Sequence, residues 1–369
     1  MGRFSPVLLL LFTACTDHLL VDDNEPLTDE LTAVGGAIEQ SGVPRNVPSV
    51  CGVQTWRFQS PVDAGMNVSV ARRAHGAVAL ATPRSGGVMT GFELDTQMNM
   101  VAQGKVAPDV EPTRVVASSV GSHLASTAIQ GDVVHVHLLD DGLANAKYVA
   151  KLVGTSVAEP AFYTLDGRLV MPAIADDGLW LHQLSDSFEP LASTRVASSQ
   201  PARSLAAAQL GSSLLTAWST DDACHMMLSS GVSSAIDTRV PSACHEPRMA
   251  VNPSTNEGVM VFDSAAGVRL MNVSATQLSG DSSVVCPETY APRTLFDGTN
   301  FWVSYLNARG DVVVGVLGAN RKVVTIALAD AHPEPGAYEL ALVGGAPWVV
   351  ALNSEGYTAH RMCVDTVWE

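Results

Sequence analysis

Short hydrophobic runs alternate with turn residues along the chain from Cys51 onward. Val, Leu, Ala, Thr and aromatic residues form the runs, and Gly, Asn, Asp and Ser separate them, which is typical of β-strands joined by tight turns. The clearest stretch runs from Pro292 to Ile326 and predicts four strands: RTLF, FWVSYL, DVVVGVL and KVVTI. Four short antiparallel strands in succession make one blade of a β-propeller.

The same unit recurs at intervals of about 45 residues, a period within the range of four-stranded propeller blades. A proline, in most cases preceded by an acidic or amide residue, stands at the start of six units: Glu111-Pro112, Glu159-Pro160, Gln200-Pro201, Glu246-Pro247, Ala291-Pro292 and Glu334-Pro335. The start of a strand is where a missing N–H costs least. An earlier unit fits residues 67–106 without the proline, so the sequence predicts seven units.

The last unit, from Glu334, has room for only three strands. The segment Val53–Phe58 (VQTWRF) can supply the fourth from the N-terminal side, and a ring closed in this way leaves no free sheet edge. We therefore predict an all-β domain over residues 49–369, a seven-bladed β-propeller with four-stranded antiparallel blades, closed by an N-terminal strand. Six or eight blades, or a pair of β-sandwiches, are the alternatives.

The composition is that of a folded, acidic protein. Of the 369 residues, 47% are hydrophobic and 16% are charged, which allows a large core and excludes a disordered chain. The formal net charge is −16. Because phosphate contacts need a basic face, we expect no nucleic-acid partner.

The first residues of the chain, MGRFSPVLLLLFTAC, carry an export pattern. Arg3 precedes the apolar run Val7–Phe12, which is far too short to span a bilayer. The stretch Phe12-Thr13-Ala14-Cys15 resembles the lipobox of bacterial lipoproteins. That resemblance implies that residues 1–14 are a signal peptide and that Cys15 is lipidated. Because Thr16, and not Asp, follows the cysteine, it also implies the outer membrane of the cell envelope.

Residues 15–48 form an acidic segment between this anchor and the repeats. After Cys15 the segment holds seven acidic residues against one base, Arg45, and it is broken by Gly35-Gly36 and three prolines. Such a segment buries little and repels itself, so we expect a flexible tether. The protein is thus predicted to be exported and to contact the membrane through its lipid.

Five cysteines follow the lipobox, and export permits disulfides. Cys51 lies at the edge of the predicted closing strand and Cys363 lies in the last strand, so these two should pair and staple the ring. Cys224 begins a third strand and Cys244 ends a link between blades, and these positions share one face of a propeller. We expect a Cys224–Cys244 disulfide, which leaves Cys286 over; Cys244–Cys286 is the rival pairing.

Charged residues recur where the first strand of a unit begins, and the first strands line the central channel of a propeller. They are Glu111, Arg114, Glu159, Arg203, Glu246, Arg248, Arg293 and Glu334. Because repeats duplicate structural residues, we interpret the arginines as structural partners of nearby carboxylates at the channel mouth. The alternative is a polar mouth that binds a charged ligand or a metal.

No catalytic motif stands out. The sequence contains no P-loop, nucleophile elbow, HExxH or EF-hand loop, so we predict no catalytic residue, metal or cofactor. The favoured function is an envelope-anchored scaffold that binds a protein or carbohydrate partner through the loop faces of the propeller. The alternative is an extracytoplasmic hydrolase or lyase that uses paired carboxylates in the predicted turns, such as Asp140-Asp141, Asp176-Asp177 and Asp221-Asp222.

Overall fold

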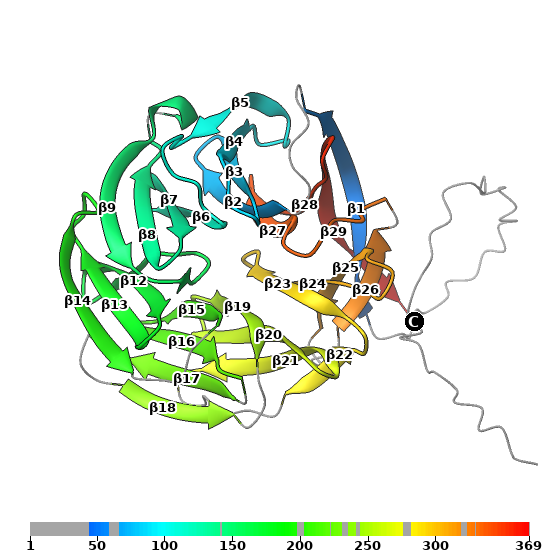
Figure 1. Ribbon diagram of the computed structural model, residues 1–369. Helices are drawn as coiled ribbons and strands as arrows, with labels where there is room; N and C mark the ends of the chain where they lie inside the picture. Colours follow the sequence, from blue (N-terminus) through cyan, green and yellow to red (C-terminus); the bar gives the residue numbers. More distant parts are fainter. Residues whose placement is uncertain are drawn as a thin grey trace, which may run out of the picture.

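Seven antiparallel β-sheets stand around a central axis in the computed structural model (Figure 1). The structure describes residues 44–58, 66–140, 142–197, 203–221, 223–230, 235–240, 244–275, 282–318, 323–328 and 330–368. Each sheet is one blade, numbered here 1 to 7 in chain order from β2, and its strands follow one another outwards from the axis. The prediction of an all-β, seven-bladed propeller with four-stranded antiparallel blades is confirmed.

The strands take the same four positions in every blade. The continuous inner strands are β2 (Met66–Arg73), β6 (Arg114–Val120), β15 (Leu205–Leu210), β19 (His245–Asn252), β23 (Tyr290–Phe296) and β27 (Tyr338–Val343). In blade 3 the inner position is divided between β10 (Ser156–Val157) and β11 (Tyr163–Leu165). The second strands are β3 (Gly76–Pro83), β7 (His123–Gln130), β12 (Arg168–Ala175), β16 (Ser213–Ser219), β20 (Glu257–Ser264), β24 (Phe301–Leu306) and β28 (Ala346–Leu352).

The outer half of each blade is built in the same way. The third strands are β4 (Met89–Leu94), β8 (Val133–Leu138), β13 (Gly178–Leu184), β17 (Cys224–Ser229), β21 (Gly267–Ser274), β25 (Val312–Leu317) and β29 (Gly356–Trp368). The outer strands are β5 (Met100–Val106), β9 (Lys147–Val153), β14 (Pro190–Ala197), β18 (Ala235–Val240), β22 (Ser283–Cys286), β26 (Val323–Leu328) and β1 (Pro44–Arg57). One 3-10 turn is present among the described residues, η1 (Leu143–Asn145), and it follows β8.

The core lies between neighbouring blades, so the second strands are covered on both faces. Every residue of β3 is buried, which explains why this strand is apolar without strict alternation. Three tryptophans on second strands, Trp218, Trp302 and Trp348, are fully buried. Although only 6% of the residues are aromatic, these large side chains fill space in the core between the blades.

Blade 7 joins the two ends of the propeller. Its strand order is β27-β28-β29-β1, so the N-terminal strand closes the ring as predicted. Strand β1 begins at Pro44, before the predicted end of the tether at residue 48, because β29 runs on to Trp368 and pairs with it. Gly356 permits the close approach of the two strands: a Cβ there would lie 1.9 Å from the carbonyl oxygen of Trp56.

Two disulfides join neighbouring segments of the propeller. Cys51–Cys363 joins β1 to β29 with a Cα–Cα distance of 5.9 Å, and Cys224–Cys244 joins β17 to the segment before β19 with 5.1 Å. Both are the pairs expected from the order of the blades. The expectation that Cys286 is left over is wrong, because Cys286 is disulfide-bonded as well. It ends the outer strand β22 and is half-buried.

The face of the ring at which the inner strands begin carries the links between blades, and we call it the link face. Antiparallel pairing brings the turns between second and third strands, such as residues 84–88, to this face as well. The predicted signal peptide, Cys15 and the tether as far as residue 43 lie outside the described residues. Within the described part of the chain, no helix has the length and apolar character needed to cross a membrane.

Candidate functional site

A cavity of about 310 Å³ lies at the mouth of the channel on the link face. Every blade, or the link that leads into it, contributes to the wall of this cavity. Five of its residues are among those expected from the sequence: Arg114, Glu159, Glu246, Arg248 and Arg293. Three further polar residues, which were not expected from the sequence, complete the wall: Asn67, Arg84 and Ser204.

Three of the expected mouth residues lie elsewhere. Glu111 and Glu334 are exposed in the links before β6 and β27, and neither lines the cavity. Arg203 forms an exposed ion pair with Asp221 at 2.8 Å. The Glu-Pro marker therefore does not occupy one structural position: in blade 5 it falls inside the inner strand and carries Glu246 to the cavity, whereas in blades 2 and 7 it precedes the inner strand.

Glu159 reaches the axis because the inner strand of blade 3 is interrupted. Strand β10 ends opposite Ala173 of β12, and β11 resumes opposite Val170, so the five residues 158–162 face only two residues of β12. The surplus residues leave the ladder, and the bulge turns the Glu159 carboxylate towards the channel. This segment contains the only cis peptide bond among the described residues, Glu159-Pro160.

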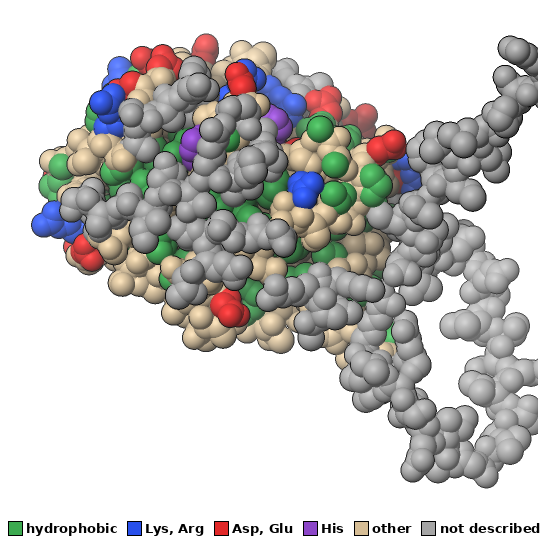
Figure 2. Space-filling view, turned by 90° about the horizontal axis from the view of Figure 1, so that it is seen from below, with side chains coloured by type: hydrophobic (Ala, Val, Ile, Leu, Met, Phe, Trp, Pro, Cys, Tyr) green, Lys and Arg blue, Asp and Glu red, His purple; other side chains and the backbone are tan. Residues whose placement is uncertain are grey.

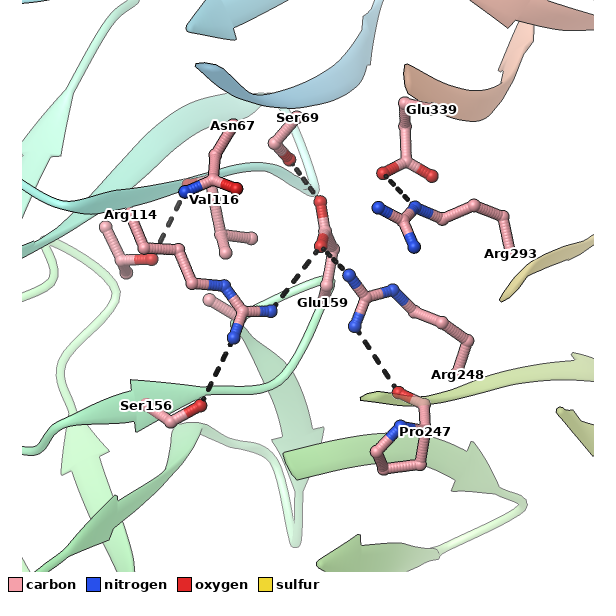
Figure 3. A network of polar contacts seen from close by, with 12 residues as sticks. Asn67, Ser69, Arg114, Val116, Ser156, Glu159, Pro247, Arg248, Arg293 and Glu339 are labelled. Atoms are coloured by element: carbon pink, nitrogen blue, oxygen red, sulfur yellow. Dashed lines mark hydrogen bonds and ion pairs between the residues drawn. The ribbon is translucent and has the colours of Figure 1, made fainter. Parts of the chain in front are cut away.

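Glu159 lies at the centre of a network of polar contacts (Figure 3). Its Oε2 is 3.0 Å from Nη2 of Arg248 and 4.0 Å from Nη2 of Arg114. Its Oε1 accepts a hydrogen bond from the Ser69 hydroxyl, whose oxygen accepts one from the N–H of Ala117 at 3.0 Å. Burial alone would raise the pKa of Glu159, but the guanidinium groups of Arg248 and Arg114 hold it below its usual range. The carboxylate therefore stays ionised at neutral pH.

A second ion pair, between Arg293 and Glu339, is buried beside the first. Nε of Arg293 lies 3.3 Å from Oε2 of Glu339, and the two side chains are 3% and 11% exposed. Arg293 also donates a hydrogen bond to the Pro292 carbonyl at 2.9 Å, and its guanidinium lies 5.0 Å from the centre of the Tyr338 ring. Burial raises the pKa of Glu339, and Arg293 opposes that shift. The signal for Glu339 in the sequence is a lone acid inside the apolar strand YELALV.

Arg84 differs from the other arginines of the cavity in its position and its exposure. It lies in the turn between β3 and β4, is exposed, and has no ion-pair partner within 4.0 Å among the described residues. Its guanidinium is packed over Gly336, where a Cβ would come within 2.6 Å of Nη2 of Arg84 and 2.5 Å of Oδ1 of Asn67. The absence of a side chain at Gly336 leaves this side of the cavity open to Arg84.

Two of the three carboxyl groups at the mouth, Glu159 and Glu246, have lowered pKa values and suit binding better than acid–base catalysis, whereas burial raises the pKa of Glu339 to about 7. Four guanidinium groups surround three carboxyl groups: Arg84, Arg114, Arg248 and Arg293 around Glu159, Glu246 and Glu339. Burial raises the pKa of Glu246, but the arginines outweigh it and leave the pKa below its usual value. Carboxylates with lowered pKa are weak proton acceptors at neutral pH. Among the described residues, no group of three His, Cys, Asp or Glu side chains is placed to hold a metal ion.

A larger cavity, of about 630 Å³, lies on the opposite face between blades 1 and 2. In its wall Nδ1 of His123 lies 2.7 Å from Oδ2 of Asp140, and these side chains are 44% and 34% exposed. The other oxygen of Asp140 accepts a hydrogen bond from the Leu124 N–H at 2.7 Å. Asp140 therefore holds the start of β7 in place, which is a structural use of one predicted turn acid.

One acid of each of the other two predicted pairs also makes a local contact, whereas Asp141 and Asp222 lie outside the described residues. Asp177 accepts a hydrogen bond from Nε1 of Trp180 at 2.8 Å and pairs with Arg195 at 3.3 Å. Asp221 pairs with Arg203 on the surface. Aspartate is common in turns for such local contacts, and none of these described carboxyls converges with another.

The comparisons with known proteins agree with the fold. No protein-family model matches the chain, and no curated protein matches it. Among solved structures, a streptogramin B lyase superposes with a TM-score of 0.58 at 11% identity, covering 85% of this chain and 98% of that one. The WD40 domain of Toxoplasma gondii coronin gives 0.54 at 12% (88% and 90% covered), and the RRP9 WD40 repeats give 0.57 at 9% (86% and 99%). At such low identity the likeness shows a β-propeller body and nothing finer.

Proposed function

We propose that this protein is an exported binding protein, lipid-anchored at the outer membrane through Cys15, whose propeller binds a protein or carbohydrate partner through the link face. One observation carries the proposal: charged side chains from most blades converge on a cavity at the channel mouth. Several partly buried charges are costly to assemble unless they are paired or used, and here the guanidinium groups outnumber the carboxyls.

The surroundings of the cavity support binding through this face. Links and second-to-third-strand turns surround the mouth, and such loops tolerate sequence change while the sheets beneath stay rigid. On the side of the ring seen in Figure 2, uncharged surface predominates among the described residues, and the charged side chains lie mainly along its upper edge. The link face thus combines adaptable loops with concentrated charge.

Two features of the chain support export and anchoring. The stretch ending at Cys15 has the form of a lipoprotein signal. The disulfides of the propeller are those of a protein that folds in an oxidising compartment. An acidic tether would then hold the link face away from the membrane surface, where a partner can approach it.

Site-specific photocrosslinking tests the binding face. A photoreactive residue in place of Glu334, which is exposed on the link face, should crosslink one discrete partner in intact envelopes. The control is the same residue in place of Ser212, which is exposed in the turn between β15 and β16 on the opposite face. A crosslink from position 212 in place of position 334, or from neither, would contradict the proposed face.

Fractionation tests the anchor. Cys15→Ala should release the protein from the membrane fraction or leave the precursor uncleaved, and mass spectrometry of the wild-type N-terminal peptide should show a lipid on Cys15. A mature N-terminus elsewhere would contradict lipidation. A Cys15 peptide recovered in a disulfide would contradict it too, because the lipid uses the same sulfur. Once Cys51–Cys363 and Cys224–Cys244 have formed, Cys15 is the one other cysteine in the sequence that could pair with Cys286, so this peptide decides between the lipid and the disulfide.

A further inference from the structure

We propose that the cavity at the channel mouth binds an oxyanion group of the ligand, a carboxylate or a phosphate, through Arg84, Arg114 and Arg248. This inference rests on the proposed function, because it gives a chemical class to what the link face binds. The interpretation of the arginines as structural partners accounts for Arg293, but it leaves donors of Arg114 and Arg248 unused and did not include Arg84.

The balance of charge in the cavity opposes that of the whole protein. The chain has a formal net charge of −16, yet at the mouth four guanidinium groups surround three carboxyls. A local excess of positive charge in a concave, partly desolvated site attracts anions more strongly than the same charges on an open surface. Self-repulsion among these arginines has a cost that an anion would relieve.

The four arginines differ in how far their donors are used. Arg293 is buried against Glu339 and two backbone carbonyls. Arg248 contacts Glu159 with Nη2 and the Pro247 carbonyl with Nη1 at 3.4 Å, and its buried Nε has no hydrogen-bond acceptor among the described residues. Arg114 lies 4.0 Å from Glu159, which is too long for a hydrogen bond, and reaches the Ser156 hydroxyl at 3.4 Å.

Arg84 has the most free donors. It has no ion-pair partner among the described residues, and Gly336 opens the space beside it. Planar guanidinium groups bind carboxylate and phosphate oxygens in pairs, with shorter and stronger hydrogen bonds than neutral donors make. Three guanidinium groups with unused N–H donors, on different blades around one cavity, are therefore suited to hold one oxyanion between them. Figure 3 shows two of them, those of Arg114 and Arg248, on either side of Glu159.

The size of the cavity sets the class of group that fits. About 310 Å³ is at the lower end of the range for small-molecule sites. Glu159 and Glu246 share the cavity with the arginines and limit the ligand to a group that engages the arginines without meeting these carboxylates. A small dianion, or one anionic group at the end of a larger ligand, satisfies both limits.

Calorimetric titration of the full-length protein with inorganic phosphate and with succinate, at constant ionic strength set by chloride, tests the proposal. Phosphate is the probe for a phosphoryl group and succinate is the probe for a carboxylate, and saturable binding of either supports the site. Arg84→Ala should weaken the binding about tenfold, the loss expected for one charge-assisted hydrogen bond, and it removes no observed ion pair. Glu159→Gln should strengthen the binding, because it removes a competing carboxylate.

The matched control is Arg195→Ala, which makes the same change of charge on the outer strand β14, far from the cavity. It should leave the affinity within twofold of the wild type. The absence of saturable binding of both anions, or an equal loss in Arg195→Ala and Arg84→Ala, would overturn the inference. The crosslink from position 334 would still occur if the link face binds a partner without an anionic group, so the two proposals fail separately.

Discussion

Replacement of Glu159 with glutamine tests whether the charge cluster is built around this carboxylate. Glutamine keeps the size of the side chain and can still accept the hydrogen bond from Ser69. It removes the negative charge that lies 3.0 Å from Arg248 and 4.0 Å from Arg114. We expect a marked loss of stability, because the guanidinium groups are then left partly buried without a counter-charge.

The distances and the burial set the magnitude. At an effective dielectric constant of about 20, the two attractions are about 5.5 and about 4 kcal/mol before any desolvation is subtracted. Glu159 and Arg248 are 14% and 11% exposed, so the loss should approach that of halving a buried pair, about 3–5 kcal/mol. With an unfolding entropy of about 2.1 cal/mol/K for each of about 320 folded residues, a loss of about 4 kcal/mol lowers Tm by about 6 °C.

Differential scanning calorimetry and urea unfolding measure this loss, with Asp221→Asn as the matched control. Asp221 contacts Arg203 at 2.8 Å, a shorter distance than that of the Glu159–Arg248 pair, but both side chains are more than 60% exposed. Exposed pairs contribute little, so the control should change the free energy of unfolding by no more than about 0.5 kcal/mol. Equal losses in the two variants, or no loss in Glu159→Gln, would refute the reasoning from burial.

Three further predictions concern Gly356 and the Cys51–Cys363 disulfide, which lie where the ring closes, and the buried Asp263. Gly356→Ala should lower the free energy of unfolding, measured in urea, by about 2 kcal/mol, because the new Cβ would overlap the facing strand. Gly104→Ala is the control and should not destabilise the protein, because no atom lies within 4 Å of its Cβ. The Cys51→Ser/Cys363→Ser variant should lose about 5 kcal/mol, because this disulfide closes a loop with a sequence separation of 312; an unchanged Tm would contradict this. Burial raises the pKa of Asp263 to about 7 in the folded state, above its value in the unfolded chain. The protonated carboxyl therefore favours the folded state at low pH, and this contribution to stability is lost as the pH rises from about 4 to about 7. Relative to Asp263→Asn, the wild type should therefore lose up to about 4 kcal/mol between pH 4 and pH 8, and parallel stability–pH curves would contradict it.

The architecture of the ring follows closely from the sequence. The strands of blade 6 were visible as four runs between turns, and the three-strand final unit required an N-terminal partner. The pairing of Cys51 with Cys363 followed from that closure, since both lie on strands that must be neighbours. Period, turn residues and closure are local or topological properties, and the chain displays them directly.

The composition of the mouth follows from the sequence only in part. Glu111 and Glu159 carry the same Glu-Pro marker, but only Glu159 reaches the cavity, because the inner strand of blade 3 is split. Arg84 comes from a turn two strands away from the channel, and Glu339 is an acid within an apolar strand. Which side chains converge on an axis depends on the register of each blade relative to its neighbours, and this relation between distant segments has no local signal.

A crystal structure of the full-length protein with tungstate, a tetrahedral oxyanion located by its anomalous scattering, tests the central claim most directly. The account predicts one ordered tungstate in the cavity at the channel mouth, within hydrogen-bond distance of Arg84 and at least one of Arg114 and Arg248, with the Glu159 carboxylate turned away from it. The site should be lost in Arg84→Ala crystals and kept in Arg195→Ala crystals. A cavity that holds only water at saturating tungstate, or tungstate bound only at scattered surface sites, would contradict the claim.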